Sequence, residues 1–128
     1  MNSKELMIGD WAIFNGNPLK VQAIDSRDSE IVAEDGIFCT EESRWAYTAD
    51  KVEGIPLTPE ILEKNGWKRY EIFMDMKADE NINFSWTDMY GESLFQNGYH
   101  MCDCKYVHTL QHVLRLYGLN ELADNFKV

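Results

Sequence analysis

The sequence has no long apolar segment and only a few cysteines. No stretch approaches the ~18 consecutive apolar residues of a membrane-spanning helix, and the N-terminus lacks a basic region followed by an apolar run. We therefore expect neither membrane insertion nor export. Cysteine occurs three times in 128 residues, an odd count that predicts reduced thiols in a cytoplasm rather than a disulfide framework.

The chain also lacks the familiar catalytic motifs. It contains no serine nucleophile elbow, no paired-carboxylate motif and no glycine-rich phosphate loop. A hydrolytic site is conceivable only with His108 as the base, oriented by Asp103 or Glu92. Because structural histidines outnumber catalytic ones, we favour a protein that is not an enzyme.

Basic residues are scarce relative to acidic ones. Twelve Lys and Arg stand against 22 Asp and Glu, so the formal net charge is −10 at pH 7. Diffuse negative charge repels a phosphate backbone and an anionic bilayer, which argues against direct binding to nucleic acid or membrane. Some acidic proteins imitate nucleic acid instead, and this acidic mimic is our third functional hypothesis.

What the chain does have is a globular composition with regular local patterns. Hydrophobic residues make up 45% and charged residues 27%, so one compact body could bury about two-thirds of its unfolded surface. The first part of the chain alternates short apolar runs with turn signals such as Asn15-Gly16 and Asp35-Gly36. Four or five strands at this spacing predict a small SH3-like β barrel or curled sheet over residues 1–54.

Residues 55–128 predict an α+β subdomain that packs with the first as one unit. A threonine followed by a proline begins a short helix over residues 59–65. Alternating apolar positions then predict strands over residues 70–76 and 82–86 of an antiparallel sheet. The strongest helical pattern covers residues 106–117, and we expect this C-terminal helix to pack on the sheet.

Three stretches of the chain resemble one family. They are GDWAIFNGNPLKVQAI at residues 9–24, GIPLTPEILEKNGW at residues 54–67 and KYVHTLQHVLRLYGLNEL at residues 105–122. They look like small uncharacterised proteins of Bacteroides-type gut bacteria, their phages and mobile elements, which carry an IPLT helix and a YxHxLQN helix. The resemblance implies a bacterial or phage cytoplasmic setting and no mechanism. His112 stands where the family pattern has Asn.

The segment HMCDCKYVHTLQH, residues 100–112, concentrates the usual ligands of zinc. On a strand, Cys102 and Cys104 would share one face, because side chains alternate with period two. On the following helix, His108 and His112 are four residues apart and share a face. These four side chains could close a tetrahedral zinc site.

The expected geometry argues against this zinc site. At about 100° per residue, the apolar arc of the helix faces the sheet, and both histidines fall on the opposite, polar face. The cysteines belong to the sheet, and Cys-x-Cys is less diagnostic of zinc than Cys-x-x-Cys. We therefore expect buried, unreactive cysteines and no cofactor, with zinc as the alternative. His108 would then hydrogen-bond a backbone carbonyl of a neighbouring strand.

The remaining candidates are aromatic. A groove lined by Trp and Tyr is a common surface for docking peptides, and Trp45, Tyr47 and Tyr90 are the side chains that we expect at such a surface. Tyr90 lies in a predicted turn and is the aromatic residue most expected to be exposed. The sequence thus predicts a non-enzymatic protein-binding or accessory module, with its partner and oligomeric state unidentified.

Overall fold

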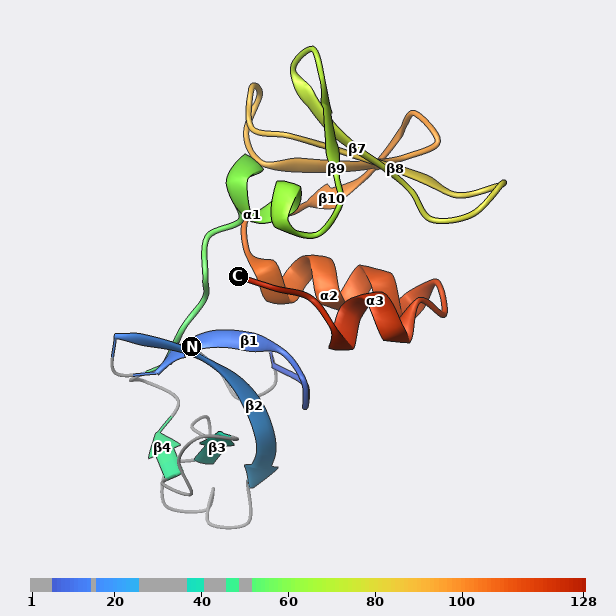
Figure 1. Ribbon diagram of the computed structural model, residues 1–128. Coiled ribbons are helices and arrows are strands. Elements are labelled where there is room, and N and C mark those ends of the chain that lie inside the picture. The colour runs from blue at the N-terminus through green and yellow to red at the C-terminus, as the bar shows by residue number, and fades with distance from the viewer. Residues whose placement is uncertain (1–5, 15, 26–36, 41–45, 49–51) are drawn as a thin grey trace.

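Two antiparallel sheets and the helices that lie between them make up the described part of the chain (Figure 1). The computed structural model describes residues 6–14, 16–25, 37–40, 46–48 and 52–128. The mixed content of helices and antiparallel strands confirms the predicted α+β class.

The first sheet is built mainly from sequential hairpins. Its strands are β1 (Trp11–Phe14), β2 (Asn17–Asp25), β3 (Ile37–Thr40), β4 (Ala46–Thr48) and β5 (Val52–Glu53), in the spatial order β4-β3-β2-β1-β5. Phe14 pairs with Asn17, so β1 and β2 form the expected hairpin, and Asn15 of the predicted turn lies outside the described residues. Within the described residues β4 and β5 are the sheet edges, and no closed barrel is found. The predicted turn at Asp35-Gly36 lies outside the described residues.

The second sheet is a meander in which each strand pairs with the next. Its strands are β6 (Lys68–Tyr70), β7 (Phe73–Lys77), β8 (Asn83–Thr87), β9 (Ser93–Gln96) and β10 (Tyr99–Asp103). Asn97 and Gly98 both have positive φ, as a two-residue hairpin turn requires. The prediction of one strand over 70–76 is wrong, because the chain reverses at Glu71, whose φ is 55°, and Tyr70 pairs back on Phe73.

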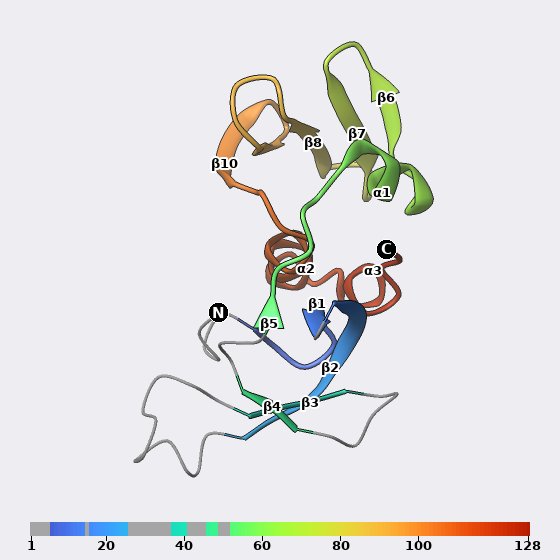
Figure 2. The same ribbon diagram turned by 90° about the vertical axis from the view of Figure 1, so that its left-hand side faces the viewer.

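Three helices accompany the sheets: α1 (Pro59–Lys64), α2 (Val107–Leu116) and α3 (Asn120–Asp124). The hydroxyl of Thr58 caps α1 by accepting from the N–H of Ile61 at 3.2 Å. In both ribbon views α2 and α3 lie between the two sheets (Figures 1 and 2). No helix in the described residues has the length and apolar character needed to cross a membrane.

The core lies between α2 and the inner face of the second sheet. Trp86 and Phe84 of β8 are its largest fully buried side chains, and the indole N–H of Trp86 donates to the carbonyl oxygen of Cys104 at 2.8 Å. Each fully buried large apolar side chain contributes about 1.5–3 kcal/mol through removal from water. The helix and the sheet contribute further buried residues: Met74, Leu94, Val107, Leu110, Val113 and Leu114.

Candidate functional site

The two described cysteine side chains lie on the core side of the second sheet. Cys104 is fully buried, and its backbone N–H donates to the carbonyl of Glu92 at 2.9 Å. Burial raises the pKa of the Cys104 thiol far above its usual range, and the neighbouring Cys102 raises it further. Partial burial, and then the charge of Asp103, also raise the pKa of Cys102. Both thiols therefore stay protonated and weakly nucleophilic near neutral pH.

The two histidines of α2 lie on its other face, toward the first sheet. His108 is only 5% exposed, and its ring stacks on Tyr106 with 5.5 Å between centroids. Gly54 lies so close to this pair that an added Cβ would be 2.7 Å from the Tyr106 ring. The prediction that the histidines occupy an exposed face is wrong, because β1 and the residues before it cover that face of the helix.

The four predicted zinc ligands are therefore divided between the two faces of α2. Cys102 and Cys104 lie at the core between α2 and the second sheet. His112 lies on the other side of α2, where it is bonded to Asp10. Among the residues that the structure describes, no group of three or more His, Cys, Asp or Glu side chains could hold a metal ion. Zinc binding by Cys102, Cys104, His108 and His112 stays an untested prediction.

A buried carboxylate, Asp10, organises the contact between α2 and the first sheet. Its side chain is 0% exposed. Its Oδ1 accepts from Nη1 of Arg115 at 2.5 Å, and its Oδ2 lies 2.5 Å from Nε2 of His112. The backbone N–H of Met7 donates to Oδ2 at 2.8 Å, and Arg115 also reaches Asp124 at 3.5 Å. The three partners Arg115, His112 and Met7 fix the position of the Asp10 charge and so hold α2 against the first sheet.

Gln111 makes a second connection from α2 to the first sheet. Its Oε1 accepts from the backbone N–H of Trp11 at 2.9 Å. Its Nε2 donates to the carbonyls of Gly9, at 3.1 Å, and Ala123, at 2.9 Å. A fully buried amide with all these partners joins β1, α2 and α3 into one packed unit. We refer to Asp10, Gln111, His112 and Arg115 as the interlayer cluster.

The predicted binding aromatics have different positions. Tyr90 is 83% exposed in the turn between β8 and β9, as expected. Trp45 lies outside the described residues, and so does the side chain of Tyr47. A binding role for these three residues stays a prediction.

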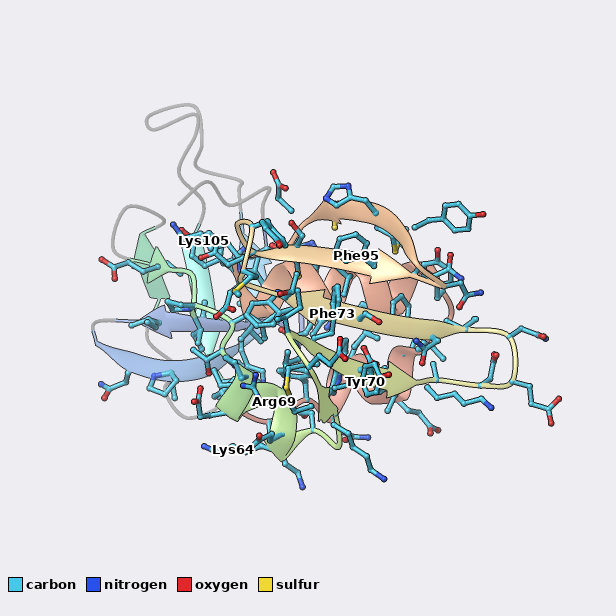
Figure 3. All side chains as sticks on the ribbon, turned by 90° about the horizontal axis from the view of Figure 1, so that it is seen from above. Lys64, Arg69, Tyr70, Phe73, Phe95 and Lys105 are labelled. Carbon is cyan, nitrogen blue, oxygen red and sulfur yellow. The ribbon has the colours of Figure 1, made fainter. Side chains whose placement is uncertain are left out.

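The outer face of the second sheet, turned away from α2, carries aromatic side chains that no helix of the described residues covers. Figure 3 looks down on this face and shows Phe73 and Phe95 over its central strands. Their rings meet edge to face with centroids 5.8 Å apart, and neither belongs to the core. Tyr70, directly opposite Phe73 on β6, is 65% exposed on the same face. We call this surface the outer face.

A groove of about 220 Å³ lies within the outer face. Phe73, Asp75, Ser85, Phe95 and Gly98 line it. Asp75 and Ser85 are directly opposite each other on β7 and β8, and Ser85 is opposite Phe95 on β9, so the three side chains share one face. The Oδ1 atom of Asp75 is buried and has no hydrogen-bond partner. No sequence motif marks the residues that line this groove, although alternation with Met74 and Met76 places Phe73 and Asp75 on the outer side of the sheet.

A larger groove of about 350 Å³ lies beside α1 and α3, and the side chain of Asn65, which lines it, is already engaged. Nδ2 of Asn65 donates to the carbonyls of Ile61 and Lys127, both at 2.8 Å. The N–H of Lys127 returns a bond to Oδ1 of Asn65 at 2.8 Å. These bonds hold the C-terminal residues against α1.

The geometry does not support a hydrolytic site in which Asp103 orients His108. Asp103 lies beside His100, with 4.0 Å between Oδ1 and Nε2, rather than beside His108. His112 shares its carboxylate with Arg115, so Asp10 serves a structural ion pair as well as the imidazole.

Comparison with protein-family models, curated proteins and solved structures finds no match to this chain. A functional assignment therefore rests on the geometry of its own surface.

Proposed function

We propose that this chain is a non-enzymatic protein-binding module and that the outer face of the second sheet is its contact surface. The observation that carries the proposal is the edge-to-face pair of Phe73 and Phe95, which lies outside the core on a face that none of the described helices covers. Aromatic side chains are enriched at the buried centres of protein interfaces, where they provide large contact areas.

The surroundings of this pair favour a protein partner. Tyr70 extends the aromatic surface to β6, and polar groups lie beside the rings at Asp75 and Ser85. An apolar centre with a polar rim is typical of a protein interface. The net charge of −10 favours partners that present basic side chains.

We also propose the finer architecture and setting. The strand order β4-β3-β2-β1-β5, in which the last strand returns to pair with the first, supports an SH3-like barrel for residues 1–54. The family resemblance of residues 54–67 and 105–122 supports action in a bacterial cytoplasm as an accessory of a phage or mobile element.

The test is affinity capture from a Bacteroides lysate with three matched baits. One bait is the unaltered protein, the second carries Phe73→Ser and Phe95→Ser, and the control carries Tyr99→Ser at an exposed position outside the groove. Circular dichroism and thermal melting first establish that all three baits are folded. Hydrogen exchange on the recovered complex then locates the contact surface.

The proposal predicts proteins that the unaltered and Tyr99→Ser baits retain and the double variant loses. Amides of β7 and β9 should gain protection in the complex. If the double variant retains every protein that the unaltered bait retains, the outer face is not the contact surface.

A further inference from the structure

The groove in the outer face has the chemistry of a receptor for one cationic side chain. We infer that it binds an arginine side chain presented by the partner protein, an inference that rests on the proposed function. The groove combines a carboxylate, a hydroxyl and two aromatic rings within about 220 Å³. This volume suits one side chain rather than a whole structural element.

The carboxylate of Asp75 is the central feature of this groove. Its Oδ1 is buried without any hydrogen-bond partner. A buried carboxylate oxygen without a donor costs free energy, which an incoming N–H group recovers.

The cationic residue directly opposite Asp75 in the sheet leaves this carboxylate available. Lys68 is directly opposite Asp75 on the neighbouring strand β6, on the same side of the sheet. Its side chain is exposed, and the described residues show no ion pair between the two. A ligand with a cationic group can therefore approach Asp75.

The neighbouring side chains favour guanidinium over a simple ammonium group. A planar guanidinium stacks on an aromatic face, and Phe73 and Phe95 offer such faces beside Asp75. Its forked N–H groups can donate to Asp75 and to the hydroxyl oxygen of Ser85 together. An ammonium group is a compact point charge without this planar fork.

An anionic polymer is the competing occupant, because aromatic rings also stack on the bases of single-stranded nucleic acid. Figure 3 shows Lys64, Arg69 and Lys105 to one side of the aromatic pair, and the register places Arg69 opposite the buried Met74. The carboxylate of Asp75, however, lines the groove itself and would repel phosphate. Loss of the Asp75 charge must weaken the binding of a cationic ligand and strengthen the binding of an anionic one.

The experiment is a titration of the full chain followed by amide NMR shifts. The probes are N-acetyl-arginine amide, its neutral analogue N-acetyl-citrulline amide, N-acetyl-lysine amide and a thymidine oligonucleotide. Asp75→Asn removes the groove charge, and the matched control Asp88→Asn removes one charge from an exposed position outside the groove.

We expect the arginine probe to shift the amides of Phe73, Asp75, Ser85 and Phe95. Asp75→Asn should weaken its binding at least about tenfold, and citrulline should bind at least about tenfold more weakly, as the loss of one charge-assisted hydrogen bond implies. The lysine probe should bind more weakly than arginine, and Asp88→Asn should leave arginine binding unchanged.

Three results would overturn the inference. They are equal binding of citrulline and arginine, equal weakening by Asp75→Asn and Asp88→Asn, and oligonucleotide binding that Asp75→Asn strengthens. The capture experiment separates this inference from the proposed function. If the Phe73/Phe95 double variant loses partners and Asp75→Asn keeps them, the outer face is the contact surface but its groove does not bind an arginine of the partner.

Discussion

Nε2 of His112 lies 2.5 Å from Oδ2 of Asp10, and this pair joins the C-terminal helix to the residue that precedes the first strand. The carboxylate is completely buried, whereas 28% of the His112 side chain is exposed. The polar side of α2 is thus an internal contact, in which one acidic side chain holds an imidazole and a guanidinium.

Replacement of Asp10 by Asn should lower the free energy of unfolding by about 3 kcal/mol, because it leaves a mostly buried Arg115 without its principal counter-charge. Urea unfolding measures the loss. The control is Asp103→Asn, whose side chain is 95% exposed and whose effect should stay within about 0.5 kcal/mol. A similarly small loss for Asp10→Asn would show that the ion pair contributes little.

Replacement of Gly54 by Ala should destabilise the protein by about 1–3 kcal/mol, since the new methyl group would overlap the Tyr106 ring and press on His108. A double-mutant cycle with Tyr106→Ala tests the cause. Removal of the ring opens space for the methyl group, so the two losses should sum to more than the loss of the double variant, by at least about 0.5 kcal/mol. Additive losses would point to a backbone effect instead.

The buried thiol of Cys104 should make stability depend on alkaline pH. Its pKa is raised by burial and then by Cys102, so the thiol ionises in the unfolded chain above about pH 8.5 while the native thiol keeps its proton. The unfolded state then binds fewer protons, and the stability that the neutral thiol contributes is lost as pH rises, by up to about 1.4 kcal/mol per pH unit. Urea unfolding between pH 7 and 10 should show this slope for the unaltered protein and a shallower slope for Cys104→Ala. Equal slopes for the unaltered protein and Cys104→Ala would show that the Cys104 thiol does not cause the loss of stability.

Because the cysteine and histidine side chains lie on opposite faces of α2, we expect the protein to bind little zinc. Protein purified without a histidine tag should contain far less than one equivalent of zinc by elemental analysis, and a chelator should leave its melting temperature unchanged. One equivalent of zinc, with a loss of several kcal/mol on chelation, would mean that Cys102, Cys104, His108 and His112 rearrange to meet one ion.

Features that depend on neighbouring residues could be predicted from the sequence. The Thr58-Pro59 start of α1, the Asn97-Gly98 turn and the extent of α2 follow from capping, positive φ and apolar periodicity. The reversal at Glu71 was missed because a glutamate gives no turn signal. That error placed Tyr70 on the inner side with Met74, whereas the register pairs it with Phe73.

Features that depend on distant residues could not be predicted. Gln111, His112 and Arg115 look like a solvated helix face, and only the approach of Asp10 and Trp11 from about a hundred positions earlier makes them internal. The groove around Asp75 was missed for a related reason. Its side chains come from β7, β8 and β9, and their convergence depends on strand register rather than on any local motif.

The interlayer cluster also sets the order in which the protein can mature during synthesis. Asp10 and His112 are 102 positions apart, so the beginning of the first sheet emerges from the ribosome long before the helix that covers it. Until then Asp10 has neither its imidazole nor its guanidinium partner, and β1 lacks the contact with Gln111. The first sheet therefore acquires its final stability only after α2 has been translated.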